Sequence, residues 1–226
     1  HSITQKINCD EIFNEIVSHL KTKHGCKEFA FLAANTLNSE EGDERYNAFL
    51  NAIKKFDLSF STENLVEGKF VYEIAKDELK KKYKSKKDVK FDAVVAANDA
   101  MAIAAMDYFD ELGINVPNEV KVVGFDDSIS SRLVHPRLST ISQNVYGQGY
   151  RAAEIANDIL DGKSVEKNEI TELRAIYRQS CGCVDKRNPD PICFDSYGNQ
   201  SFENDVVTVK ENYADVIRDK VGIIVF

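Results

Sequence analysis

Polar side chains follow three apolar runs of the sequence, at the points where the runs end. These side chains are Asn35, with Arg45 shortly downstream, Asn98, Asp99, Asp126 and Asp127. Carboxylate and amide oxygens accept hydrogen bonds from hydroxyl groups, and a guanidinium offers a planar fork of donors. Such a set suits a site that binds a polyol. From the spacing alone, a second interpretation stays open, in which Asp99 only caps a helix and Asp127 only starts a turn.

No sequence motif of catalysis accompanies these residues. The phosphate-binding pattern GxxxxGK[ST], the metalloprotease pattern HExxH, the hydrolase pattern GxSxG and a GxGxxG after a strand are all missing from the sequence. No nucleophile with a partner base can be recognised either. We therefore expect no enzymatic activity and no cofactor.

The histidines and cysteines do not have the spacing of metal ligands. The histidines are His1, His19, His24 and His135. Cys181, Cys183 and Cys193 offer three thiol groups near the end of the chain, but no paired CxxC motif is present. We therefore expect reduced structural thiols and no metal site, with metal binding by the three thiols as the less favoured alternative.

The apolar pattern alternates between two periods along most of the chain. Helical spacing predicts helices over 10–24, 39–56, 71–83, 99–112 and 147–160, the first capped by Asp10 and the fourth by Asp99. Short apolar runs predict strands at 28–34, 65–66, 91–97, 119–125, 138–142 and 172–178. Strands separated by helices of this length indicate parallel crossovers, and ligands bind beyond the carboxyl ends of such strands. The sequence predicts an α/β fold with a mostly parallel, Rossmann-like sheet of about five strands and helices on both faces.

Composition narrows the possible partners and the compartment. The chain has 226 residues and a formal net charge of −8, so it is not expected to bind nucleic acid by itself. No apolar stretch of about 18 residues is present, so no membrane partner is expected. Five scattered cysteines and no visible signal peptide favour the reducing cytoplasm.

Several stretches together resemble one known family. They are HLKTKHGCKEFAFLAA (19–34), GDERYNAFLNAI (42–53), VVAANDAMAIAAMDYFDELGINVPNEVKVVGFDDS (94–128) and HPRLSTISQNVYGQGYRAAEIANDIL (135–160). In this order they resemble the effector-binding domain of the LacI/GalR family, which has the periplasmic-binding-protein type I fold. The resemblance runs from about residue 10 to Cys183. The ending RQSCGC, with His24-Gly25 upstream, resembles a branch in which the sensor domain is often fused to a diguanylate cyclase (GGDEF), histidine kinase or AraC-type output domain.

The resemblance implies a set of ligand-binding residues. Arg45, Asn98 and Asp126 match ligand contacts of the family. Phe70 stands where the family often has an aromatic ring that stacks on a sugar, and Gln143 falls at a crossing between the two lobes. Three of these five residues are also in the polar set at the ends of the apolar runs.

The resemblance also implies a domain organisation. The family fold has two lobes with the ligand between them, and this chain matches mainly the second lobe plus the crossover helix at 147–160. We expect residues 1–183 to form a sensor domain whose first lobe is largely missing, without a helix-turn-helix headpiece. Residues 184–226 read as a linker and C-terminal arm. Lys220–Phe226 resembles the opening strand of such a lobe, so a permuted or swapped arrangement is an alternative.

The function implied is sensing of a small molecule. We expect a LacI-type transcriptional regulator or signalling protein in which a sugar, or next a nucleoside, closes two lobes. The alternative is a solute-binding protein for sugar transport. The least favoured hypothesis is an enzyme built on a Rossmann-like sheet. The unpartnered apolar face of the crossover helix predicts a homodimer. DNA would be contacted only through a headpiece or output domain absent from this chain.

Overall fold

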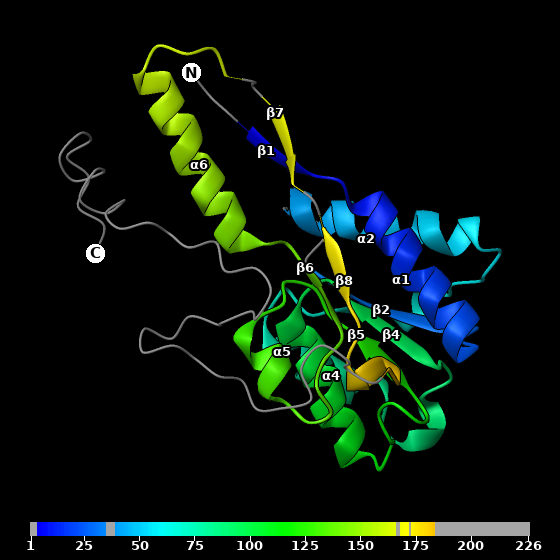
Figure 1. Ribbon diagram of the computed structural model, residues 1–226. Coiled ribbons are helices and arrows are strands. Elements are labelled where there is room, and N and C mark those ends of the chain that lie inside the picture. The colour runs from blue at the N-terminus through cyan, green and yellow to red at the C-terminus, as the bar shows by residue number, and fades with distance from the viewer. Residues whose placement is uncertain (1–3, 35–38, 166–167, 172, 184–226) are drawn as a thin grey trace. The chain divides into compact units, whose positions relative to one another are not determined.

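The computed structural model describes residues 4–34, 39–165, 168–171 and 173–183 (Figure 1). Asn35 and Cys193 lie outside the described residues. Residues 184–226, for which we expect a linker arm and a strand-like end at Lys220–Phe226, also lie outside the described residues.

A parallel sheet forms the centre of the described domain. Its four strands, in spatial order, are β3 (Leu65–Glu67), β2 (Phe29–Ala33), β4 (Ala93–Ala96) and β5 (Lys121–Val123). All residues of β2 and β4 are buried, as expected for inner strands that helices cover on both faces. Beyond β5, parallel bridges from Val123 to Ser139 and from Asp126 to Ser142 continue the sheet toward β6 (Thr140–Ser142).

Helices cover both faces of this sheet. They are α1 (Cys9–His24), α2 (Glu40–Lys55), α3 (Tyr72–Lys82), α4 (Asp99–Glu111) and α5 (Ile129–Leu133). A further helix, α6 (Val145–Leu160), does not cover the sheet, and Ile155 is its one buried residue. Helix α1 packs against α2, and α3 packs against α4. Figure 1 shows α1 and α2 on one side of the strands and α4 on the other. The predicted α/β fold with a parallel sheet flanked by helices is confirmed. Among the described residues, no helix is both long enough and apolar enough to cross a membrane.

Two strand pairs lie outside the central sheet. Strand β1 (Thr4–Ile7) pairs in parallel with β7 (Asn168–Thr171), and neither strand was predicted from the sequence. The last predicted strand is β8 (Arg174–Ile176), which pairs antiparallel with β6. Its direction differs from that of the central sheet because the chain returns along β6 after α6. Short 3₁₀ turns lie at Thr62–Asn64, Lys86–Asp88 and Gln179–Cys181.

The helix caps correct two sequence expectations. Asn8, not Asp10, caps α1, because its side chain accepts a hydrogen bond from the Asp10 backbone N–H. Asn98, not Asp99, caps α4 by accepting from the Met101 N–H at 3.0 Å. Asp99 is thereby left free to turn its carboxylate toward β6.

Candidate functional site

The carboxyl ends of the strands bring the five predicted site residues into one contact group. Arg45 comes from α2, Phe70 follows β3, Asn98 follows β4, Asp126 follows β5 and Gln143 follows β6. Arg45 Nη1 lies 3.7 Å from Asp126 Oδ1, and its Cζ lies 5.5 Å from the centre of the Phe70 ring. Asn98 joins the group by donating from Nδ2 to the Phe70 carbonyl at 3.0 Å. Whether these side chains contact a ligand stays a prediction.

Arg45 is the fixed centre of the group. Its side chain is only 6% exposed. Its Nη1 donates to the Ala97 carbonyl at 2.6 Å, and its Cζ lies 4.0 Å over the Phe125 ring. A guanidinium held between an aromatic face and a carbonyl keeps one orientation. Arg45 therefore presents a stationary positive charge to Asp126.

Asp126 is the more accessible partner of this pair. Its side chain is 36% exposed. Its Oδ1 accepts from Gln143 Nε2 at 2.6 Å, while no hydrogen bond to Oδ2 is found from the described part of the chain. Burial raises the pKa of Asp126, whereas Arg45 and the Gln143 amide act against that rise. Oδ2 is thus a carboxylate acceptor that a hydroxyl group from outside could reach.

The loop after β3 holds Phe70 in an unusual backbone conformation. Lys69 and Phe70 have φ values of 53° and 61°, in the left-handed region that side chains disfavour. The preceding Gly68 has no room for a side chain, because an added Cβ would lie 2.5 Å from Met101 Sδ. Strained backbone of this kind gathers at functional sites.

Asn98 and Asp99 are occupied inside the protein. Asn98 uses its oxygen as the α4 cap and its amide on the Phe70 carbonyl. Asp99 is buried, accepts from Thr140 Oγ1 at 2.6 Å and from the Ser128 N–H at 2.7 Å, and burial raises its pKa to about 6. Asp99 therefore ties α4 to β6, which rules out the interpretation that it only caps a helix.

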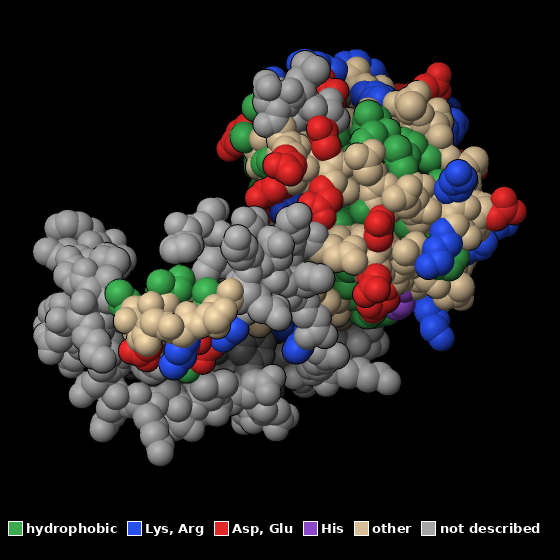
Figure 2. Space-filling model, turned by 90° about the horizontal axis from the view of Figure 1, so that it is seen from above, with side chains coloured by type: hydrophobic (Ala, Val, Ile, Leu, Met, Phe, Trp, Pro, Cys, Tyr) green, Lys and Arg blue, Asp and Glu red, His purple; other side chains and the backbone are tan. Residues whose placement is uncertain are grey.

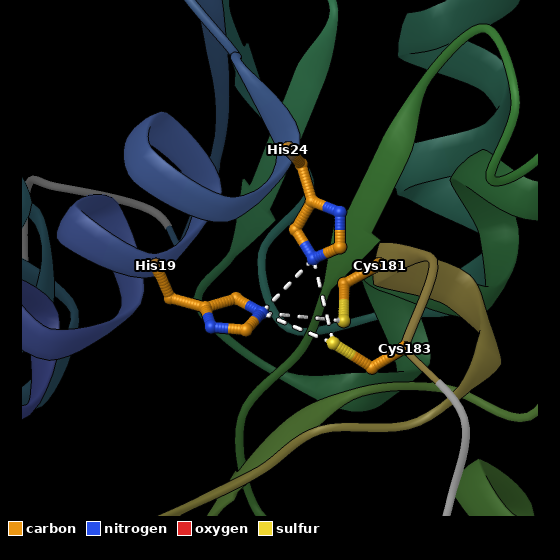
Figure 3. A group of neighbouring side chains, drawn as sticks. All are labelled: His19, His24, Cys181 and Cys183. Atoms are coloured by element: carbon orange, nitrogen blue, oxygen red, sulfur yellow. Dashed lines mark hydrogen bonds between the residues drawn. The ribbon is translucent and has the colours of Figure 1, made fainter.

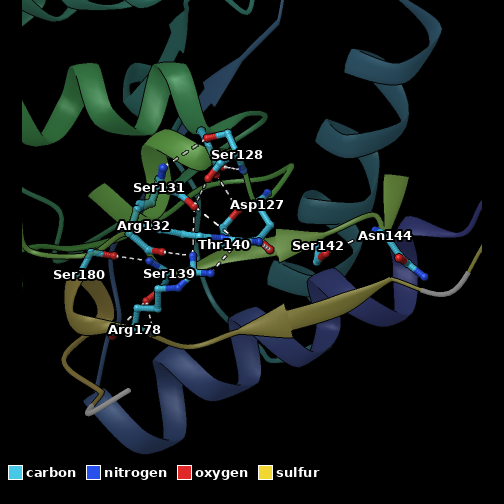
Figure 4. A network of polar contacts seen from close by, with 12 residues as sticks. Asp127, Ser128, Ser131, Arg132, Ser139, Thr140, Ser142, Asn144, Arg178 and Ser180 are labelled. Atoms are coloured by element: carbon cyan, nitrogen blue, oxygen red, sulfur yellow. Dashed lines mark hydrogen bonds and ion pairs between the residues drawn. The ribbon is translucent and has the colours of Figure 1, made fainter. Parts of the chain in front are cut away.

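Asp127 does more than start a turn, because it is the centre of a buried ion network (Figure 4). Its carboxylate accepts from Arg178 Nη2 at 2.6 Å and pairs with the Arg132 guanidinium. Arg178 also donates to the Leu138 carbonyl at 2.8 Å and to Ser131 Oγ at 3.1 Å. Sequence reasoning missed both arginines, since their partner Asp127 lies up to 51 residues away along the chain. The network fixes the chain after β8 to the loop after β5.

A second cluster lies at the C-terminal end of α1 (Figure 3). It consists of His19, His24, Cys181 and Cys183, whose ligand atoms all lie within 4.8 Å of one another. Burial lowers the pKa of His19 to about 4 and also lowers that of His24, while burial raises the pKa of Cys183 to about 12. The sequence analysis missed this cluster because up to 164 residues separate its members. The spacing of residues that are close together in the sequence cannot predict contacts between residues so far apart.

A comparison with family models identifies the fold. Residues 17–181 match the model of the periplasmic binding protein-like domain. The chain belongs to this family. The match covers the second half of α1, the central sheet and the helices from α2 onward, and it ends within the His/Cys cluster.

Curated relatives of this periplasmic-binding-protein-like domain are LacI-type regulators. The chain is 40% identical over 83 residues to the HTH-type transcriptional regulator GalR of Escherichia coli, covering 37% of this chain and 24% of GalR. It is 29% identical to the repressor PurR of Pasteurella multocida, covering 64% of this chain and 42% of PurR. It is 27% identical to the regulator RegA of Clostridium saccharobutylicum, covering 72% and 49%. The chain spans about half or less of the length of these relatives.

Solved structures place the domain in the same group. The transcriptional repressor AscG of Escherichia coli has a TM-score of 0.70 at 26% identity, covering 80% of this chain and 64% of that one. A periplasmic binding protein/LacI transcriptional regulator from Alkaliphilus metalliredigens has a TM-score of 0.67 at 26% identity, covering 79% and 65%. The domain is thus a LacI/GalR-type effector-binding domain, as the sequence motifs predicted. This membership agrees with the expectation of a binding module rather than an enzyme.

Proposed function

We propose that this domain senses a small polyol, a sugar first and a nucleoside next, as the effector-binding part of a LacI-type regulator. The observation that carries the proposal is the group of Arg45, Asp126 and Gln143 at the carboxyl ends of the strands. Within the described residues no hydrogen bond reaches Asp126 Oδ2, and the Asp126 side chain is 36% exposed beside a fixed guanidinium. A carboxylate next to a fixed cation stays ionised and accepts hydroxyl hydrogen bonds.

Each residue of the group has a separate task in this proposal. Asp126 accepts from ligand hydroxyl groups, and Arg45 holds it in place and ionised. Phe70, half-buried beside Arg45, offers its ring to the apolar face of a sugar. Asn98 donates a hydrogen bond to the Phe70 carbonyl and so holds the loop that carries the Phe70 ring.

Gln143 links the site to the segment that leads out of it. Its amide donates to Asp126, and its backbone carbonyl accepts from Gln148 Nε2 at 2.6 Å in the first turns of α6. Because Gln143 bonds both to Asp126 and to the start of α6, a ligand that engages Asp126 acts on α6 through Gln143. Lobe closure about this crossing would then shift an equilibrium between two states. Residues 1–183 would be the sensor unit, acting in the cytoplasm as a homodimer.

The comparisons support a sugar and a regulatory role. The structure from Alkaliphilus metalliredigens was solved as a complex with D-xylulofuranose. A further relative, 25% identical over 146 residues, is the ribose operon repressor of Lactococcus lactis. In a regulator, DNA would be contacted by a headpiece or another output domain, since this chain is acidic with a net charge of −8. The proposal extends to fusion with a GGDEF, histidine kinase or AraC-type output.

The test is a ligand screen followed by a matched pair of variants. A thermal-shift panel of monosaccharides, disaccharides and nucleosides identifies the stabilising compound, and calorimetry gives its Kd for wild type and for Asp126→Ala. Loss of a charged acceptor is expected to cost about 1.5–3 kcal/mol, or roughly a 10- to 150-fold weaker Kd.

The control for this pair is Asp110→Ala, which removes an exposed carboxylate near the C-terminal end of α4 and should keep the wild-type Kd. Equal affinity of wild type and Asp126→Ala would remove Asp126 from the site. A panel in which no polyol raises Tm would contradict the ligand class.

A further inference from the structure

The four side chains of the His/Cys cluster lie close enough together to surround one metal ion. The Nε2 atoms of His19 and His24 lie 3.0 Å apart. Cys183 Sγ lies 3.2 Å from His19 Nε2 and 3.4 Å from His24 Nε2, and Cys181 Sγ lies 3.9 Å from His19 Nε2. Around a zinc ion with ordinary Zn–N and Zn–S bonds, the edges of a tetrahedron measure about 3.3–3.8 Å. The four separations given bracket this range, and all the ligand atoms lie within 4.8 Å of one another.

We propose that His19, His24, Cys181 and Cys183 together bind one Zn²⁺ ion. Two thiolates and two imidazoles in a tetrahedron are the donor set that selects zinc, whereas Mg²⁺ and Ca²⁺ require oxygen ligands. Binding releases the two thiol protons to solvent. All four positions are filled by protein, so the ion is structural and offers no open position for catalysis.

The local backbone is built to point the four donors inward. Helix α1 ends at His24 because Gly25 adopts the left-handed conformation with φ 71°, which places His24 at the helix end. Gly182 has φ 92°, so the chain turns between Cys181 and Cys183 and both sulfurs face the histidines (Figure 3). An added Cβ at Gly182 would lie 3.3 Å from the His24 ring in a disfavoured backbone conformation.

The surroundings hold the ligands and leave a path to solvent. The His19 ring stacks on Tyr177 at 3.8 Å between ring centres, and Tyr177 donates to Glu15 Oε1 at 2.9 Å. This stacking sets the direction of the His19 ring. A shallow depression lined by Cys183, His135 and neighbouring residues opens beside the cluster, giving an ion a route to the ligands.

A zinc ion here would join two distant parts of the chain. His19 and Cys181 are 162 residues apart, on α1 and in the turn after β8. The ion would therefore fasten the end of the described domain to its first helix. This role is separate from effector binding, since none of the four ligands belongs to the group around Asp126.

The first test measures the metal content of the whole chain, purified without chelators. We expect about one zinc per chain in wild type and less than a tenth of that in Cys181→Ser/Cys183→Ser. The matched controls are Cys9→Ala, Cys26→Ala and Cys193→Ser, each of which should keep the wild-type content. Cys9 and Cys26 are buried free thiols outside the cluster, and Cys193 lies outside the described residues. Loss of zinc in Cys193→Ser would overturn the ligand set.

The second test needs no variant and so does not depend on the folding of one. Zinc is removed from wild type with a chelator and Co²⁺ is added. Intense visible bands of tetrahedral Co²⁺, with thiolate charge-transfer bands in the ultraviolet, are expected at one equivalent and should disappear on adding Zn²⁺. Zinc removal should lower Tm by roughly 5 °C or more.

Three results would overturn the proposal. The first is that wild type is purified without zinc and takes up none when zinc is added. The second is a pale octahedral Co²⁺ spectrum. The third is a tetrahedral Co²⁺ spectrum that persists in Cys181→Ser/Cys183→Ser. A reduced thiol pair with no affinity for metal would give the first of these results.

Discussion

Asp99 and Asp126 are carboxylates at the same edge of the sheet, yet their surroundings give them different tasks. Asp99 is 1% exposed and directs both oxygens to groups of the protein. Asp126 has a side chain that is 36% exposed, with one oxygen bonded to Gln143 and a guanidinium beside it. The first therefore holds elements together, whereas the second is suited to bind.

The buried Asp99 carboxyl predicts a pH dependence of stability. Its pKa is raised to about 6 in the folded protein, above the ordinary value of 3.8. The protonated form of Asp99 thus favours the folded state. Its contribution to the free energy of unfolding is complete below pH 4 and is lost as pH rises through about 6. Wild type should lose up to about 3 kcal/mol between pH 4 and pH 7 through this residue. Asp99→Asn, which cannot titrate, should lack this loss.

The measurement for Asp99 is urea denaturation of both proteins at a series of pH values. Other carboxylates titrate in both proteins, so the difference between the two free energies of unfolding isolates Asp99. We expect wild type to weaken relative to Asp99→Asn as pH rises. A difference that is constant from pH 4 to pH 7 would show that the Asp99 pKa is not raised.

At the scale of elements, the loop after β5 and the chain after β8 are held by the same carboxylate. Asp127 pairs with Arg178 and Arg132, and the side chains of Arg178 and Asp127 are each 7% exposed. Charges at this depth have lost their water, so their pairing decides whether they stabilise or destabilise the fold. The Ser180 hydroxyl donates to the Val122 carbonyl at 2.6 Å and adds a neutral bond between β5 and the turn after β8.

Removing the charge of Asp127 should destabilise the domain. Asp127→Asn keeps the size and the tolerance for the positive φ of 53° but removes the negative charge that faces two guanidinium groups. We expect a loss of about 3 kcal/mol in the free energy of unfolding, measured by urea denaturation at pH 7.

The control for Asp127 is Lys81→Ala, which breaks an exposed pair with Glu78 and should change the free energy by less than about 0.5 kcal/mol. If Asp127→Asn were as stable as this control, the buried network would not support the fold.

The helices and strands that could be predicted from the sequence are those whose buried residues follow a regular local pattern of apolar side chains. Strands β2 and β4 are buried on both faces and read as continuous apolar runs, and α1 and α2 show clear helical spacing. Strands β1 and β7 were not predicted, because neither TQKI nor NEIT is an apolar run. The direction of β8 depends on where the chain returns after α6, which local pattern does not report.

The candidate site was predictable in part for the same reason. Asp126 and Asn98 stand directly after apolar runs, so the rule for parallel sheets places them at one edge. The roles of Asp99 and Asp127 were not predictable, since they depend on Thr140, Arg178 and other partners distant in sequence. The His/Cys cluster was missed because His19 and His24 meet the cysteines only through tertiary folding.

At the scale of the whole molecule, α6 differs from the other long helices. Ile155 is the one buried residue of this helix, all of whose residues are described. Large apolar side chains on it are exposed: Val145 by 66%, Tyr146 by 73% and Leu160 by 60%. Figure 2 shows hydrophobic side chains along one edge of the helix at the left of the view, with charged side chains on the other edge. An amphipathic helix of this kind usually packs against a partner.

We expect a second copy of the chain to cover this face of α6. Tyr146 and Leu160 fall on one side of the helix at helical spacing, so their burial in a homodimer would remove exposed apolar surface from water. Sedimentation velocity at roughly 10–100 µM, where weak dimers form, should show a dimer for wild type. Tyr146→Ser/Leu160→Ser should shift it to monomer with little change in Tm, because both side chains are exposed within one chain.

The matched control for α6 is Ile129→Ser/Leu133→Ser, which removes two apolar side chains of α5 that are 57% and 63% exposed. These residues lie on a different helix, so this variant should stay dimeric if α6 forms the contact. A wild type that sediments as a single monomer over the whole concentration range would contradict the dimer. If the α5 variant became monomeric and the α6 variant stayed dimeric, the dimer contact would lie on α5 and not on α6.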